Sequence, residues 1–149
     1  TNGTCPEMLE KIGKAKKQPT NTYLSVEAWD EKSYRDFCKP LNKNQWKKIN
    51  ESMEILKKAK GKTVLRITCV KSFNLDKPEN FKWIVDKLQP SYIECKGYMH
   101  VGYSQKRLER TCMPSHKEVK EFVEKLVKLT NYKFEGEQPE SWVVLLSPR

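Results

Sequence analysis

Apolar residues recur along this chain with two periods, one typical of helices and one typical of strands. Trp46, Ile49, Met53 and Leu56 fall at i, i+3, i+7 and i+10, which places them on one helical face. Two later stretches repeat this pattern, and capping residues mark where helices begin. We predict helices from Asp30 to Phe37, from Asn42 or Asn44 to Lys60 before Gly61, from Asp76 to Leu88 before Pro90, and from Ser115 to about Leu129.

Short runs rich in β-branched and aromatic residues lie between these helices and favour strands. We predict strands over residues 22–28, 63–70 and 91–96, followed by two short closing strands over residues 132–134 and 142–146. The alternation of strand and helix indicates parallel strands with right-handed crossovers. Residues 1–149 are therefore expected to form one α/β domain. The opening Thr1-Asn2-Gly3 is interpreted as the end of another strand, in a truncated or processed chain.

The three main strands alternate polar and apolar side chains, unlike parallel strands that are covered on both faces. Their polar faces carry Tyr23, Ser25 and Glu27, then Arg66 and Thr68, then Tyr92, Glu94 and Lys96. Because the apolar faces must meet the helices, the polar faces are expected to line a shared interior such as a barrel or half-barrel. Ligands of such folds sit at the carboxyl ends of the strands, near Glu27, Thr68 and Lys96.

Two alternatives stay open for this polar face. The charges could simply pair with each other, for example Arg66 with Glu94, and bind no ligand. The sheet could also be open, with one wet face.

The segment after the third strand, residues 96–110, mixes aromatics, glycines and cations. Tyrosines stack on unpaired bases, and Arg and Lys hold phosphates, so this composition suits a splayed nucleotide. The alternative is a long surface loop with a solvated run of charge.

Composition adds a possible partner and a compartment. The chain has 29 Lys and Arg against 19 Asp and Glu, a formal net charge of +10, which favours a polyanionic partner or, alternatively, a solvated lysine-rich surface. The five cysteines are dispersed, which argues against a disulfide framework or a zinc ribbon, and no metal motif is visible. No apolar run is long enough to span a bilayer and no signal peptide is present, so we expect a cytoplasmic setting.

The run IECKGYMHVGYSQKRLERTCMPSH, residues 93–116, resembles the signature of the 4-demethylwyosine synthases. PTNTYLSVEAWDEKSYRDFCKP resembles their P-T-x-x-Y-x-S-x-x-A-x-D segment, and TVLRITCVKSFN resembles their R-x-T-x-x-x-G-x-N segment, with Ser72 in place of the glycine. The opening TNG and the closing SWVVLLS agree with the same family.

This resemblance implies the C-terminal half of a partial (βα)6 radical S-adenosylmethionine barrel, with barrel units over about 1–96 and a C-terminal extension with a substrate loop over about 97–149. The family converts N1-methylguanosine at position 37 of tRNA(Phe), beside the anticodon, to 4-demethylwyosine with pyruvate. It uses S-adenosylmethionine and two [4Fe-4S] clusters. The cluster cysteines of the family, including a C-x-x-x-C-x-x-C run, are absent here, which implies a missing N-terminal segment or partner chain.

The resemblance also suggests roles for individual residues. Lys96 is expected to be catalytic, through a Schiff base or a charge pair with pyruvate. S-adenosylmethionine is expected to contact Asn2, Ser25, Glu27 and Arg66. The anticodon loop of the tRNA is expected to contact Tyr98, His100, Tyr103, Lys106, Arg107 and Arg110. The rival interpretation is a non-catalytic, basic tRNA-binding fragment or subunit.

Overall fold

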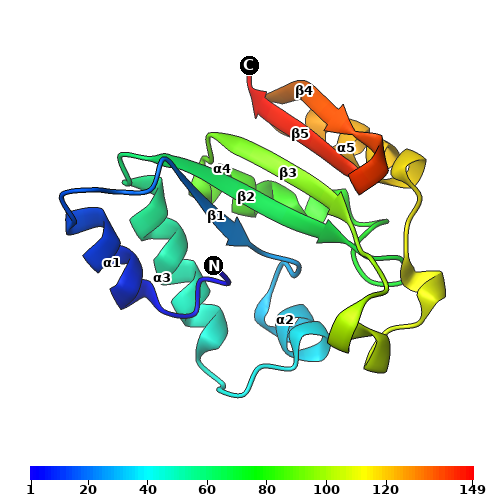
Figure 1. The fold of residues 1–149 in the computed structure, drawn as a ribbon, viewed down its shortest axis with the longest axis horizontal. Coiled ribbons are helices and arrows are strands. Elements are labelled where there is room, and N and C mark those ends of the chain that lie inside the picture. Colours follow the sequence, from blue (N-terminus) through cyan, green and yellow to red (C-terminus); the bar gives the residue numbers. More distant parts are fainter.

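The computed structural model describes all 149 residues and contains a five-stranded mixed sheet in the order β1-β2-β3-β5-β4 (Figure 1). The strands are β1 (Asn21–Ser25), β2 (Lys62–Cys69), β3 (Tyr92–Gly97), β4 (Tyr132–Gln138) and β5 (Val143–Pro148). Strands β1, β2 and β3 are parallel, as predicted, whereas β5 runs antiparallel to both β3 and β4. The expected α/β class is confirmed in this form. The sheet is open within this chain, so the partial barrel stays a prediction.

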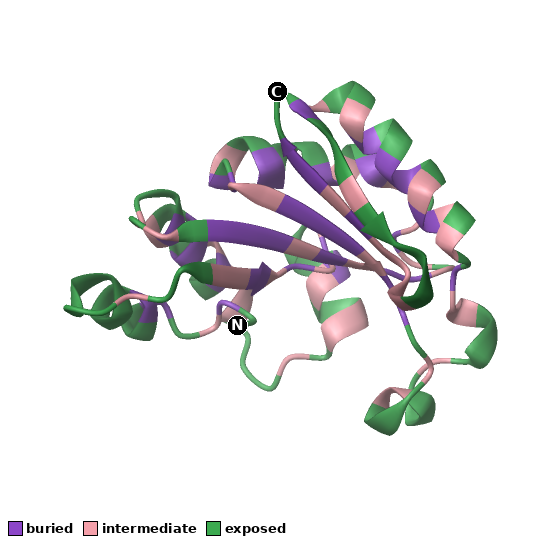
Figure 2. Cartoon of the chain, turned by 45° about the horizontal axis from the view of Figure 1, so that its top comes forward, coloured by how far each residue is buried: buried purple, intermediate pink, exposed green.

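Helices α4 (Lys82–Leu88) and α5 (His116–Leu129) lie behind the sheet in Figure 1, and α3 (Gln45–Lys57) runs below β1 and β2 in that view. Their apolar stripes meet the apolar faces of the strands, so the central strands and the inner helix faces are buried (Figure 2). One continuous core results, with Leu65, Ile67, Ile93 and Phe122 almost fully buried. The opposite face of the sheet carries the polar side chains.

Capping explains two helix starts. Asp30 begins α2 (Glu31–Cys38), where its Oδ1 accepts a hydrogen bond from the Ser33 amide at 2.6 Å. Ser115 begins α5 and exchanges hydrogen bonds with Glu118. Each pair forms a capping box, which satisfies amide groups that the first helical turn leaves free.

Several predictions at element ends were wrong: α3 ends at Lys57 rather than Lys60, and β4 extends to Gln138 rather than Phe134. Asp76 caps no helix. Residues 78–81 form a 3-10 turn that leads into α4, and Lys77, the residue before this turn, makes no capping hydrogen bond with its side chain. The first strand ends at Ser25, not at Ala28. The segment after β1 is held instead by the side chain of Asn74, which donates to the Glu27 carbonyl at 2.9 Å. After Asp76 the chain first forms a turn, in which the Asn80 amide donates to the Lys77 carbonyl at 3.2 Å.

Helix α1 (Pro6–Lys14) has no counterpart among the predicted elements. It packs on α3 and buries only Pro6 and Leu9. Ahead of it, Thr1 pairs with the edge of β1: its amino group donates to the Tyr23 carbonyl at 2.8 Å, and its carbonyl accepts from the Ser25 amide at 3.0 Å. The first residue thus lies along the edge of the sheet.

Candidate functional site

The polar faces of β1, β2 and β3 lie side by side in register. Ser25 is level with Arg66, and Arg66 with Glu94, while Thr68 is level with Lys96 one step further along. These five side chains therefore share one face, toward the carboxyl ends of three parallel strands. In α/β sheets this is where ligands bind.

Arg66 organises the middle of this face. Its Nε donates to Glu94 Oε1 at 2.6 Å, and its guanidinium lies 4.5 Å from the centre of the Tyr23 ring. The ion pair weighed as an alternative is thus present. Only the Nε group is used, however, so the two terminal amino groups keep donors for a ligand carboxylate.

Lys96 differs from Arg66 because its ammonium group has no hydrogen bond or ion pair within the chain. It is half-buried, with Thr68 of β2 on one side and Val143 of β5 on the other. The nearest carboxylate along its own strand, Glu94, is occupied by Arg66. A half-buried cation without a counter-ion is suited to an anionic ligand.

Glu27 comes after β1 and reaches the same end of the sheet. Thr68 Oγ1 donates to its Oε1 at 3.4 Å. Burial raises the pKa of the Glu27 carboxyl above its usual value, while hydrogen bonds from its own backbone and from Thr68, and the charge of Arg66, act in the opposite direction. A carboxyl in this setting can serve as acceptor or, when protonated, as donor.

Asn74 is the residue that holds this end of the sheet together, and the predicted site omits it. Its side chain is fully buried; Oδ1 accepts from the Val70 amide at 2.7 Å, and Nδ2 donates to the carbonyls of Glu27 and Thr68 at 2.9 Å each. Ser72 nearby has a φ of 63°, a left-handed conformation that favours glycine. The R-x-T-x-x-x-G-x-N spacing was the available signal for both positions.

An aromatic stack joins the segments after β1 and β2 to α2. Phe37 and Phe73 lie parallel with ring centres 3.8 Å apart, and Trp29 stacks on Phe73 at 5.5 Å. Arg107 donates a hydrogen bond to the Phe37 carbonyl and thereby ties the loop after β3 to α2. Next to this contact, burial and the nearby Glu27 carboxylate raise the pKa of the Cys38 thiol to about 12, so that thiol stays protonated.

The residues expected to meet RNA separate into a supporting group and an exposed group. Tyr98 is buried, and its hydroxyl contacts His100 Nδ1 at 3.2 Å and Ser104 Oγ at 3.1 Å, so it shapes the loop. Tyr103 is 73% exposed, with the Lys106 ammonium 5.3 Å from its ring centre. Lys106, Arg107 and Arg110 are also exposed.

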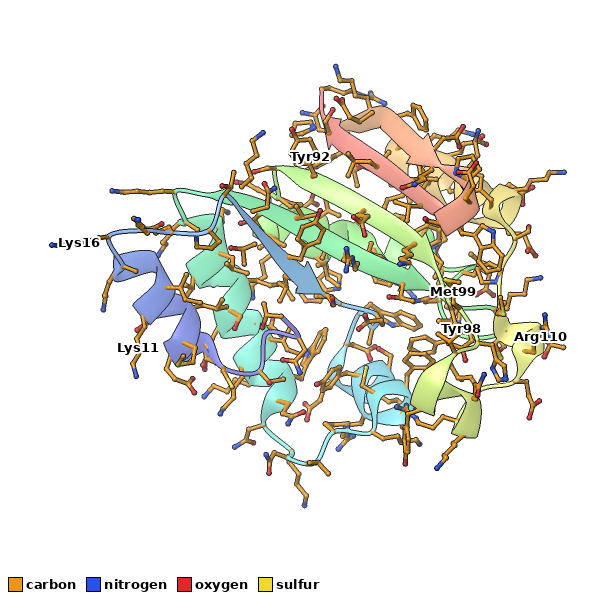
Figure 3. The ribbon with its side chains drawn as sticks, in the orientation of Figure 1. Lys11, Lys16, Tyr92, Tyr98, Met99 and Arg110 are labelled. Atoms are coloured by element: carbon orange, nitrogen blue, oxygen red, sulfur yellow. The ribbon has the colours of Figure 1, made fainter.

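A cleft of about 580 Å³ lies between this loop and α2, and Tyr103 and Arg107 line it together with Phe37, Cys38 and Leu41. Tyr98, Met99 and Arg110 all lie at this end of the molecule (Figure 3). An exposed ring beside cations and a cleft can accept a flat, negatively charged ligand such as a nucleotide.

Asn2 follows Thr1 at the edge of β1, where the Ser25 amide donates to the Thr1 carbonyl at 3.0 Å. Its side chain is exposed, and its Oδ1 accepts hydrogen bonds from the Thr4 amide and hydroxyl at 3.2 and 2.9 Å. The structure assigns it a turn ahead of α1, and its predicted contact with a cofactor stays a prediction.

The chain shows no group of three or more His, Cys, Asp or Glu side chains that could hold a metal ion. Two of its cysteines, Cys69 and Cys95, are fully buried in the core on neighbouring strands. The residues present therefore do not fit an iron–sulfur cluster, which needs several converging thiolates. None of the helices combines the length and the apolar character needed to cross a membrane.

Comparison with known proteins matches residues 87–148 to the family "Wyosine base formation". The chain is 41% identical over 147 residues to the S-adenosyl-L-methionine-dependent tRNA 4-demethylwyosine synthase of Pyrococcus abyssi, covering 98% of this chain and 43% of that protein. It is 33% identical over 132 residues to the human protein of the same name, covering 87% of this chain and 18% of that protein.

Two solved structures are similar over 99% of this chain. One, described as "Structure of TYW1 with a lysine-pyruvate adduct bound", has a TM-score of 0.85 at 30% identity, and this chain covers 45% of it. The other, "Crystal structure of archaeal TYW1", has a TM-score of 0.79 at 28% identity, and this chain covers 44% of it. These matches confirm the predicted resemblance to the 4-demethylwyosine synthases, and the chain spans less than half the length of these relatives.

Proposed function

We propose that this chain forms the later part of an enzyme of wyosine base formation in tRNA, a 4-demethylwyosine synthase that also requires a cluster-bearing part. The relatives named for that activity support the reaction. The observation that carries the proposal is the face shared by β1, β2 and β3, where Arg66 has free donors and Lys96 lacks a counter-ion.

Two ligands are proposed to bind this face, S-adenosylmethionine near Arg66 and pyruvate at Lys96. S-adenosylmethionine supplies the radical chemistry when it is bound at a [4Fe-4S] cluster. On this chain Arg66 would pair with its carboxylate, with Ser25 and Glu27 beside it and Asn2 at the edge of the sheet. A second [4Fe-4S] cluster, like the first, would be held by residues outside this chain.

Lys96 is proposed to hold pyruvate. The amine form of its side chain would add to the keto carbon, and loss of water would leave an imine that fixes the three-carbon unit in place. A solved structure that resembles this chain is described as containing a lysine-pyruvate adduct, which supports this chemistry for the family. Lys96 is the residue of this face with the required amine and no competing acid.

The tRNA substrate is proposed to approach from the loop end of the molecule, with N1-methylguanosine of the tRNA(Phe) anticodon loop entering the site. Tyr103, Lys106, Arg107 and Arg110 are exposed there for stacking and phosphate contacts, and Tyr98 with His100 supports the loop from inside.

Borohydride trapping tests the role of Lys96. The full-length enzyme carrying this chain is mixed with labelled pyruvate and borohydride, which reduces an imine to a stable amine, and the labelled residue is located by mass spectrometry. We expect label on Lys96, and we expect Lys96→Ala to abolish labelling and to lower product formation at least about 100-fold. Lys133→Ala, a change of an exposed lysine on β4, is the matched control. Labelling and turnover that survive in Lys96→Ala would remove Lys96 from the reaction.

The arginine variant separates the two roles considered for Lys96. Lys96→Arg keeps a positive charge but cannot form the imine. Partial activity in Lys96→Arg with no labelling indicates a charge pair with the pyruvate carboxylate, whereas loss of both indicates the imine.

A further inference from the structure

A second concentration of positive charge lies at the opposite end of the sheet from the substrate loop. It consists of Lys11, Lys14, Lys16, Lys17, Lys57, Lys58, Lys60 and Lys62, which we name the distal lysine cluster. Lys11 and Lys16 project outward at the left of Figure 3, far from Arg110 at the right. The site described above contains none of these residues.

Tertiary structure brings the two halves of the cluster together. Helix α1 packs on α3 with both carboxyl-terminal ends on the same side, and the Lys62 amide donates to the Thr20 carbonyl at 3.0 Å. Between the helix ends lies a cleft of about 310 Å³ lined by Lys14, Lys58 and Lys60, and one acid, Glu10 of α1, also lines it. The two lysine-rich segments, which are far apart in sequence, thus form one surface.

These lysines form no ion pair with an acidic side chain of the chain. All eight are exposed, and no ion pair includes any of them; Lys62 alone donates a side-chain hydrogen bond, to the Tyr92 hydroxyl at 3.3 Å. By contrast, Lys32, Lys71, Lys82, Lys87 and Lys120 each pair with an acidic side chain. None of the eight ammonium groups is therefore neutralised by a direct ion pair, although Glu10 lies in the same cleft.

The helix ends explain only part of this charge. Lys11, Lys14 and Lys57 lie in the last turns of α1 and α3, where a cation complements the helix dipole. Lys16, Lys17, Lys60 and Lys62 lie beyond the helices. The helix dipole does not account for the lysines beyond the helix ends, and their number and spread fit the binding of an extended polyanion better.

We propose that the distal lysine cluster is a second RNA-binding surface, which contacts the sugar–phosphate backbone of the substrate tRNA outside its anticodon stem-loop. This proposal rests on the proposed function, because that function supplies the tRNA. An RNA backbone fits better than an anionic membrane, since Glu7 and Glu10 on α1 and Glu51 and Glu54 on α3 line a neighbouring cleft that a flat membrane would also approach. A flexible RNA strand can follow the lysines and avoid the acids.

The test compares two RNA probes and two charge-matched variants of the full-length protein. Lys14, Lys16, Lys58 and Lys60 are changed together to Gln in the cluster variant. The control variant changes Lys117, Lys125, Lys128 and Lys133 to Gln; these are exposed residues of α5 and β4 in no ion pair. Binding of intact tRNA(Phe) and of its isolated anticodon stem-loop is measured over a range of salt concentrations.

We expect the cluster variant to bind intact tRNA at least about tenfold more weakly, with a salt slope lower by about three, because each of the four lost phosphate contacts removes about 0.7 to 0.9 from that slope. Its binding of the stem-loop is expected to be unchanged, and the control variant is expected to bind both RNAs within about twofold of the original protein. A cluster variant that matches the control on intact tRNA overturns the proposal. So does an equal loss on both RNAs, which would indicate general attraction by net charge.

Two further measurements keep this result apart from the proposed function. Neutralising Lys106, Arg107 and Arg110 is expected to weaken the binding of both RNAs. If it does not, the proposed role of the substrate loop is contradicted, while the proposal for the distal lysine cluster is unaffected. Binding to vesicles of anionic lipid that depends on the cluster, in the absence of any effect on tRNA, would assign the surface to a membrane and overturn the RNA proposal.

Discussion

The two ends of the parallel strands carry polar residues in opposite ways. At the carboxyl ends the polar groups hold one another: Arg66 binds Glu94, Thr68 binds Glu27, and Asn74 joins two strand ends. At the amino ends the lysines of the distal cluster project into water with no acidic partner. Side chains held in place by hydrogen bonds suit the recognition of one small ligand, whereas unpaired, mobile lysine side chains suit a long polyanion. The difference therefore distinguishes a reaction site from a binding surface.

Removing Asn74 should have the largest effect on stability. Asn74→Ala deletes three hydrogen bonds, one buried and two partly buried, and leaves the Val70 amide without a partner, so we expect a loss of about 2–4 kcal/mol in the free energy of unfolding. Urea unfolding measures this loss, and Asn42→Ala at an exposed position is the matched control. A change below about 1 kcal/mol would mean that the carboxyl ends do not depend on this side chain.

The amino ends should be sensitive to backbone packing rather than to charge. A Cβ at position 61 would lie 2.6 Å from the Pro19 carbonyl oxygen, so Gly61→Ala is expected to destabilise the fold by about 1–3 kcal/mol. Gly13, in α1, has no atom within 4 Å of such a Cβ, and Gly13→Ala should stabilise by roughly 0.5–1 kcal/mol. The melting temperatures of the two variants should therefore shift in opposite directions. Equal shifts would contradict the close approach of the Pro19 carbonyl oxygen to position 61.

The smallest effect is expected at Glu27 and depends on pH. Because burial raises its pKa above 4.5, the folded protein binds this proton more tightly than the unfolded chain does. Stability is therefore lost as pH rises from about 4.5 through the raised pKa, and the penalty stays at neutral pH. Glu27→Gln should raise the melting temperature at about pH 7 by a few degrees and leave it almost unchanged at about pH 4.

Glu124→Gln is the comparison for this measurement, since Glu124 is an exposed carboxylate on α5. If Glu27→Gln instead lowered the melting temperature at neutral pH and not at acidic pH, the ionised Glu27 carboxylate of the original protein would be held by favourable contacts.

The sequence by itself determined the local elements and the face on which each side chain lies. Periods of 3.6 and 2 follow from backbone geometry, so the stripe of α3 and the alternation of Arg66, Thr68, Glu94 and Lys96 could be derived without coordinates. The caps at Asp30 and Ser115 are likewise local, because each joins residues three positions apart. The family resemblance was also carried by continuous segments.

Only the tertiary structure decided which of these groups meet. Arg66 selects Glu94, 28 residues away, and thereby leaves Lys96 without a counter-ion; Asn74 reaches a carbonyl 47 residues away, just beyond the end of β1. The burial of Tyr98, the antiparallel direction of β5, the packing of α1 and the convergence of the distal lysines also depend on distant segments. Such contacts are fixed when the helices and the sheet pack together, and no local period in the sequence encodes them.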